Sequence, residues 1–374
     1  MPKRIIISTV GTSLLLNQAT TTERSIINAF SNAKLENYTD EAIGLLSALE
    51  HKAIEKLENA NITQLRSISA ELNGIYGLYN EKFEGCETDQ HYLIITDTLQ
   101  GETTGRIVKT QLNTIFHSVE LITPKGLSTE DKAHFTNGIK DLLKWCDDVL
   151  DAYKKSGYEI VFNLTGGFKS LQGYLNTIGM FYADRIIYIF EKGNELIEIP
   201  KLPVKIDDAL FVINASLFLQ LANDKLFDKQ VLQGIPDTML EEIEDNQFVL
   251  SAWGTLAWNN AKGQILAENL VTLPHIVYEG SFKKDFSNTI QGNEKVKLQE
   301  TLVKVSCLLQ DNKGDTAALK GGRGGGLLYD NFTGKHSNIG HFRISQSIRV
   351  SCTANNGNLY LRHYGAHDYV EHNP

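Results

Sequence analysis

The sequence predicts an α/β protein: a Rossmann-like, doubly wound domain, then a helical connector, then a small α+β domain with an antiparallel sheet. Three observations predict this class. Short apolar, β-branched runs alternate with amphipathic helical patterns up to about residue 206. A mostly helical pattern follows, and after it come short strand-like segments with turn residues between them. We therefore expect three parts, at residues 1–206, 207–273 and 274–374.

Five apolar runs in the first part predict strands, at Arg4–Val10, His91–Thr98, Ser118–Thr123, Tyr158–Thr165 and Arg185–Gly193. Most of these runs are apolar on both faces, which is typical of a parallel sheet covered by helices on each side. Helical patterns lie between them at residues 39–60, 104–117 and 136–157. The last of these ends on Gly157, a typical C-cap residue.

The third part begins with a strand that leads into a helix at Pro274–Phe286, and a longer helical pattern follows at Glu294–Asp311. Three strand-like segments come next, at His341–Ser345, Ser347–Thr353 and Leu359–Gly365. Asn356-Gly357 between the last two is a strong hairpin signal. The pattern predicts a small antiparallel sheet packed on helices.

Composition restricts the class of protein further. At 374 residues the chain is longer than a usual domain of roughly 100–200 residues. No apolar run approaches the roughly 20 residues of a membrane-spanning helix, and the short N-terminal run lacks the cleavage site of a signal peptide, so we expect no membrane association. The four cysteines are widely separated in the sequence and show none of the spacings that are typical of a zinc site or a disulfide framework. We therefore expect reduced thiols, a cytoplasmic location and no metal site.

The net charge of −9 is unevenly distributed. Residues 274–374 carry 12 Lys and Arg against 9 Asp and Glu, whereas the rest of the chain carries 24 against 36. Six of the ten histidines also lie in that last stretch. A mildly basic, histidine-rich end on an acidic body predicts that only this end meets a polyanion such as RNA.

Two loops at the ends of predicted strands have the composition of an anion site: Thr9–Leu15 and Asn163–Ser170. In open parallel sheets ligands bind at the carboxyl ends of strands, where backbone amides face outward. Gly166 and Gly167 allow close approach to the backbone, and Lys169 adds a positive charge. The spacing fits neither a Walker loop nor a GxGxxG fingerprint. The residues alone leave open that the glycines only permit a tight turn and that the lysine is solvated.

Three stretches together, "STVGTSLL", "ITDTLQGE" and "NLTGGFKS", resemble the CARF domain, the sensor domain of type III CRISPR-associated effectors, over about residues 1–206. The resemblance implies a homodimer whose paired loops bind a cyclic oligoadenylate, here cyclic tetra-adenylate, as an allosteric activator. It implies a cleft lined by Gly11, Thr12, Ser13, Thr98, Thr165, Gly166, Gly167 and Lys169. Ser13 and Lys169 also match positions that support cleavage of the activator in similar domains, so ring-nuclease activity stays an open expectation.

Arginine and histidine side chains accumulate on the last predicted strands. Strand alternation places Arg343 on one face and Phe342 and Ile344 on the other, so one face is basic and the other apolar. Such a surface can cleave RNA without a metal: a base activates the 2′-hydroxyl, guanidinium groups stabilise the phosphate, and an imidazole protonates the leaving oxygen. A solvated sheet face is the alternative interpretation of these side chains.

Residues 274–374 resemble the RelE family of toxins, which are ribosome-dependent mRNA endonucleases, through "HIVYEGSFKKDF", "FRISQSIRV" and "LYLRHYGAHDYV". The resemblance implies that the catalytic side chains are Arg349, His367, Arg343, Lys335 and His336, with no required cofactor. The two arginines would contact the scissile phosphate, His367 would be the acid or base, and the other two would add positive charge. The segment departs from the family pattern because its arginine spacing is one residue short and Glu371 replaces a terminal aromatic.

These features predict an effector in which a homodimeric sensor binds cyclic tetra-adenylate and activates an endoribonuclease that cuts mRNA on the ribosome. Arg362 and His367 also fit the R-x4-H signature of HEPN ribonucleases, an alternative that requires both residues on helices. Two further alternatives are a sensor with a non-catalytic, nucleic-acid-binding tail and a stand-alone ring nuclease.

Overall fold

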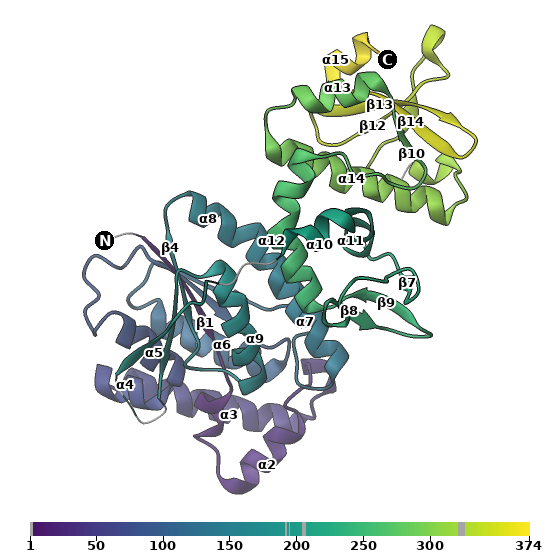
Figure 1. Cartoon of the computed structure of the whole chain (residues 1–374). Helices are drawn as coiled ribbons and strands as arrows, with labels where there is room; N and C mark the ends of the chain where they lie inside the picture. The colour runs from purple at the N-terminus through teal and green to yellow at the C-terminus, as the bar shows by residue number, and fades with distance from the viewer. Residues whose placement is uncertain (1–2, 191–192, 194, 204–206, 321–325) are drawn as a thin grey trace. The chain divides into compact units, whose positions relative to one another are not determined.

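A computed structural model describes residues 3–190, 193, 195–203, 207–320 and 326–374 (Figure 1). The chain forms two compact units, residues 1–204 and 205–374. Residues predicted as a helical connector share the hydrophobic core of the second unit, in which Trp258 packs with Phe218 while Phe342 and Tyr364 come from the last strands. The division into three functional parts stays a prediction.

The first unit is built on a six-stranded sheet of order β3-β2-β1-β4-β5-β6. Its five parallel strands are β1 (Arg4–Thr9), β2 (Gln90–Ile94), β3 (Ser118–Ile122), β4 (Glu159–Asn163) and β5 (Arg185–Ile189). An unpredicted edge strand, β6 (Leu196–Ile199), pairs antiparallel with β5. The five predicted strands are confirmed; residues 191 and 192 of the last one lie outside the described residues. The order is that of a doubly wound sheet, and it reverses between β1 and β4.

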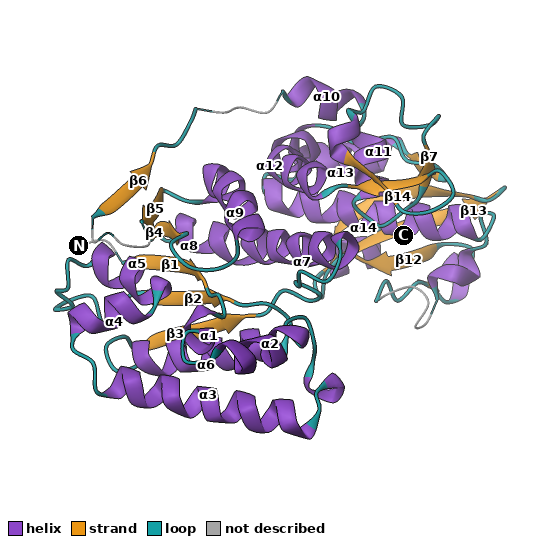
Figure 2. Cartoon of the chain, turned by 90° about the horizontal axis from the view of Figure 1, so that it is seen from below, coloured by secondary structure: helices purple, strands orange, loops and turns teal. Residues whose placement is uncertain are grey.

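Helices cover both faces of this sheet (Figure 2). They are α1 (Ser13–Leu16), α2 (Thr21–Ala29), α3 (Asp40–Glu58), α4 (Ile62–Ile68), α5 (Ala70–Leu78), α6 (Leu99–Leu112), α7 (Lys132–Trp145), α8 (Asp151–Lys155) and α9 (Lys169–Tyr182). Val161 packs in the core with residues of α3, α5 and α6, whereas its neighbour Phe162 lies against Gly179 of α9. Successive residues of a strand point to opposite faces, so α5 and α9 lie on opposite sides. Gly157, with a φ of 80°, follows α8 as predicted.

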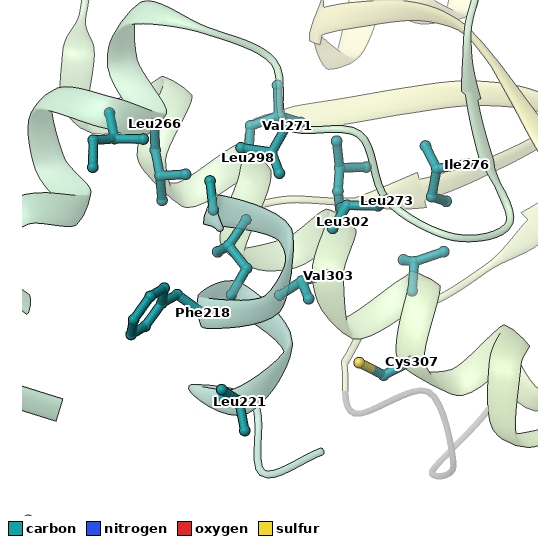
Figure 3. Close-up of a cluster of buried hydrophobic side chains, with 14 of the residues drawn as sticks. Phe218, Leu221, Leu266, Val271, Leu273, Ile276, Leu298, Leu302, Val303 and Cys307 are labelled. Atoms are coloured by element: carbon teal, nitrogen blue, oxygen red, sulfur yellow. The ribbon is translucent and has the colours of Figure 1, made fainter. Parts of the chain in front are cut away.

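The second unit begins with α10 (Asp208–Ile213), α11 (Ala215–Leu221) and α12 (Ala252–Glu268). Between α11 and α12 lies a three-stranded antiparallel sheet of order β7-β9-β8, made of Phe227–Asp228, Gln247–Leu250 and Leu240–Glu242. The sequence did not predict this sheet, because strands of two to four residues are too short to show an alternating pattern. Figure 3 shows part of the core that these helices share with α14, including Phe218, Leu266 and Leu302.

The larger sheet of the second unit has the order β10-β14-β13-β12-β11. Its strands and the accompanying helices are β10 (Ile276–Tyr278), α13 (Gly280–Asn288), α14 (Gly292–Asp311), β11 (Asp330–Asn331), β12 (Gly340–Arg343), β13 (Ile348–Asn355), β14 (Asn358–Ala366) and α15 (His367–His372). All pairs are antiparallel except β10 with β14. Asn356 and Gly357 have φ values of 47° and 74°, so the predicted hairpin turn is confirmed.

Two further expectations can be compared with the structure. The four cysteines are all buried, and none forms a disulfide. Within the described ranges, no helix has both the length and the apolar character needed to cross a bilayer.

Candidate functional site

The first candidate site lies where the strand order of the parallel sheet reverses, between β1 and β4. A crevice forms outside the carboxyl ends of strands at such a switch point. Seven of the eight predicted ligand residues follow these two neighbouring strands: Gly11, Thr12, Ser13, Thr165, Gly166, Gly167 and Lys169. A Cβ on Gly11 would lie 3.2 Å from the Cα of Gly167, so the two loops are in contact. Thr98 follows β2, one strand further along the sheet.

The glycine pair is required by the packing of its own loop. Gly167 has a φ of +86°, and a Cβ there would lie 2.8 Å from the Cβ of Thr9. A Cβ on Gly166 would lie 2.4 Å from Oε1 of Glu71. The hydroxyl of Thr9 donates to the carbonyl of Gly166 at 2.5 Å and ties this loop to β1. The tight-turn interpretation therefore explains the glycines without any ligand.

A buried polar network supports the loop after β4. Nδ2 of Asn163 donates to Oγ of Ser8 at 3.2 Å and to the carbonyl of Glu71 at 3.4 Å. Oδ1 of Asn163 accepts from both the backbone N–H and the hydroxyl of Thr165, at 3.2 and 2.7 Å. The Thr165 hydroxyl therefore points toward the core, and these hydrogen bonds hold the loop in place without a ligand.

Ser13 and Lys169 are the exposed members of the predicted set. Lys169 begins α9, whose N-cap residue Phe168 provides no side-chain cap, so the first backbone N–H groups of this helix are available to an anion beside the ammonium group. Thr98 is different, because its buried hydroxyl accepts from the N–H of Gly101 at 3.1 Å and caps α6. Thr98 therefore holds a helix in place.

Two comparisons with known proteins gave a match, one over part of the first unit and one over most of the chain. Residues 66–202 match the CRISPR-associated protein family Cas_APE2256. A solved structure, Can2 from Sulfobacillus thermosulfidooxidans in complex with cyclic tetra-adenylate, matches 96% of this chain and 76% of its own, with 11% identity and a TM-score of 0.23.

The second candidate site is one face of the antiparallel sheet. Arg343 on β12 lies directly opposite Arg349 on β13, and the next row along the same face contains His341, Ser351 and His363 from three adjacent strands. The opposite face holds Phe342, Val350 and Tyr364, which are buried in the core. The predicted division into a basic and an apolar face is thus present.

Arg349 is held rigidly, whereas Arg343 is exposed. Only 5% of Arg349 is exposed, and its Nη1 donates to the carbonyls of Ser345 and Gln346 at 3.0 and 3.3 Å. Burial lowers the pKa of the Arg349 guanidinium, and the neighbouring charge of Arg343 lowers it further, while Glu371 acts in the opposite direction. Two guanidinium groups on one face form a site that favours an anion.

His367 is the first residue of α15, and its N–H donates to the carbonyl of Ser347 at 2.9 Å. Its Nδ1 lies 3.2 Å from a carboxylate oxygen of Asp368, and its Nε2 lies 3.0 Å from one of Glu371. The ligand atoms of these three side chains lie within 4.8 Å of one another, and their contacts with each other account for the cluster without a bound ion.

Lys335 and His336 are not brought close to the arginine pair. Both are exposed on a short 3-10 helix, Gly334–His336, in the loop before β12. Arg343 is at the far end of β12, three residues beyond Gly340, which is about 10 Å along the strand.

The structure adds two histidines that the prediction did not assign to the site. Burial is the main cause that lowers the pKa of His341, whose Nδ1 is buried without a hydrogen-bond partner among the described residues. His363 places its Nδ1 2.9 Å from Oδ2 of Asp285 on α13. His341 lies two residues before Arg343, so strand alternation could have placed it on the same face from the sequence alone. No sequence signal links His363 to Asp285.

The alternative HEPN arrangement is not observed. Arg362 lies within strand β14, and only His367 lies on a helix. The R-x4-H spacing is therefore a coincidence of a strand followed by a helix, and that alternative is wrong for this fold.

Proposed function

We propose that this chain is a type III CRISPR-associated effector in which a CARF homodimer binds cyclic tetra-adenylate and activates a RelE-like endoribonuclease. The observation that supports it most is the pair of contacting loops at the switch point of a doubly wound sheet, the second of which lies within residues 66–202, the segment that matches a CRISPR-associated family. Two copies related by a twofold axis offer identical donors to each half of a symmetric ring.

The ligand site uses few side chains in this proposal. Lys169 provides the charge, the first N–H groups of α9 provide donors, and Ser13 provides an exposed hydroxyl. The fixed loop around Gly166 and Gly167 lowers the entropy cost of binding because it does not need to be ordered by the ligand.

The proposed chemistry is metal-independent RNA cleavage on the basic face of the antiparallel sheet. Arg343 and Arg349 stabilise the charge that develops at phosphorus. A base takes the proton of the 2′-hydroxyl, the 2′-oxygen attacks phosphorus, and the bond to the 5′-oxygen breaks as His367 gives that oxygen its proton. His341 is the candidate base, because it lies one row from the arginine pair on the same face and burial lowers its pKa, which favours the neutral imidazole. The products are a 2′,3′-cyclic phosphate and a 5′-hydroxyl.

The proposed substrate is mRNA held in the ribosome, since a sparse catalytic set gains its geometry from a partner that positions the RNA. The ligand activates if it binds the active arrangement more tightly than the resting one. Purified protein is incubated with translating ribosomes with and without cyclic tetra-adenylate, and mRNA ends are mapped. Ligand-dependent new 5′ ends support the proposal, and intact mRNA in both reactions contradicts it.

A second candidate is cleavage of the activator itself, which the exposed positions of Ser13 and Lys169 favour. Protein mixed with cyclic tetra-adenylate alone should then yield linear products. If the ring stays intact and no RNA is cut, the chain is instead a non-catalytic, ligand-responsive regulator.

A further inference from the structure

A buried carboxylate lies directly behind the proposed ligand loops. Glu71 is the second residue of α5, and its relative exposure is 0%. Oε1 accepts the backbone N–H of Gly11 at 2.8 Å, and Oε2 accepts the hydroxyl of Ser69 at 2.7 Å. No lysine, arginine or histidine forms an ion pair with this carboxylate in the described parts of the chain.

The position of this charge is costly. Burying a carboxylate without a cation costs several kcal/mol unless donors and dipoles compensate it. The compensation here comes from two hydrogen bonds and from the N-terminal end of α5. These are the same kinds of group that would hold a phosphate of a ligand.

The carboxylate also contacts both loops at once. Its Oε1 binds Gly11 in the loop after β1, and the same oxygen leaves no room for a side chain on Gly166 in the loop after β4. An anionic ligand that approaches the Gly11 amide therefore meets a negative charge in a region of low dielectric, where repulsion is strong.

We infer that Glu71 is a built-in anion that competes with a ligand phosphate for the Gly11 N–H and so holds the sensor below its highest attainable affinity. This inference rests on the proposed function, because it concerns the same ligand loops. The consequence is a concentration threshold. In the ligand-free chain the Glu71 carboxylate occupies the Gly11 N–H, and cyclic tetra-adenylate displaces it only above a sufficient concentration.

Calorimetric titration with cyclic tetra-adenylate tests the inference on the full chain. Glu71→Gln keeps an oxygen acceptor for Gly11 and removes the charge, so its Kd should fall about tenfold, which corresponds to about 1.4 kcal/mol. Glu58→Gln is the matched control, because it removes an exposed charge from α3, and its Kd should stay close to that of the wild type. An unchanged or weaker affinity of Glu71→Gln overturns the inference, whereas absence of binding by the wild type overturns the proposed function instead.

A second measurement avoids a variant that fails to fold. In the wild-type protein labelled with [15N]glycine, the Gly11 amide resonance should shift when cyclic tetra-adenylate replaces the carboxylate as its hydrogen-bond acceptor. A Gly11 resonance that stays in place at saturating ligand contradicts the competition.

Discussion

The two main sheets of this chain place their polar groups in opposite ways. The parallel sheet is mostly apolar within its strands, and its candidate ligand groups lie at the strand ends. The antiparallel sheet carries its candidate groups on one face, as rows across neighbouring strands. A parallel sheet covered by helices on both faces has only its ends available for chemistry, whereas an antiparallel sheet can keep one face for it. The first site is therefore made mainly of backbone, and the second mainly of side chains.

The largest effect that this comparison predicts is on RNA cleavage. Arg349→Ala removes a rigidly held guanidinium from the face and should lower the cleavage rate by roughly 100-fold or more, with ligand affinity unchanged. Arg106→Ala, which removes an exposed arginine of α6, is the control and should keep the full rate. Cleavage assays with ribosome-bound mRNA, paired with calorimetry, measure both quantities. Loss of ligand binding by Arg349→Ala would erase the distinction between the two sites.

The second prediction concerns the backbone of the first site. Gly167→Ala forces a side chain into a backbone conformation with a φ of +86° and against Thr9, so it should lower the free energy of unfolding of the first unit by about 2 kcal/mol. Gly173→Ala in α9 is the matched control, since a Cβ there meets nothing within 4 Å and should stabilise the helix by about 0.5–1 kcal/mol. Urea unfolding of both variants measures this difference. Equal urea midpoints for the two variants would show that the loop does not require glycine at position 167.

The third prediction is a pH dependence of the first unit. Burial, followed by the charge of Arg4, lowers the pKa of His91 from 6.5 to about 3. The unfolded chain therefore binds a proton that the folded chain excludes, so the stability from this group is complete above pH 6.5 and is lost as pH falls toward 3. From pH 7 to pH 5 the wild type should lose about 2 kcal/mol more than His91→Gln. Equal losses in urea unfolding would contradict the buried, neutral imidazole.

The smallest expected effect is at the exposed lysine of the ligand site. Lys169→Ala should weaken cyclic tetra-adenylate binding about tenfold, because one charge-assisted contact is lost. Lys155→Ala is the control, since Lys155 ends α8 just before β4 begins, at the opposite end of the strands. Similar affinities of both variants would remove Lys169 from the site.

The sequence predicted the elements with the strongest local signals. The β-branched runs became parallel strands, Gly157 ended its helical segment, and the Asn-Gly pair formed the hairpin turn. Edge strand β6 and the three-stranded sheet lacked such signals because their strands are short. For these elements, tertiary contacts decide the structure.

The sites were less predictable than the fold. Strand alternation correctly placed Arg343 on a face opposite to Phe342, because a period of two is local information. Glu71 could not be found, since a glutamate in a helical pattern is usually exposed, and its burial depends on tertiary contacts such as that with Gly11, 60 residues away in the sequence. The pairing of His363 with Asp285 spans 78 residues and likewise depends on the tertiary fold.

The most direct test of the account is a calorimetric titration of the wild-type chain with cyclic tetra-adenylate. A twofold pair of strand-end loops that holds one symmetric ring predicts saturable binding with about one ring per two chains. Absence of any binding heat with this ligand, measured at several temperatures, would contradict the sensor on which the rest of the account depends.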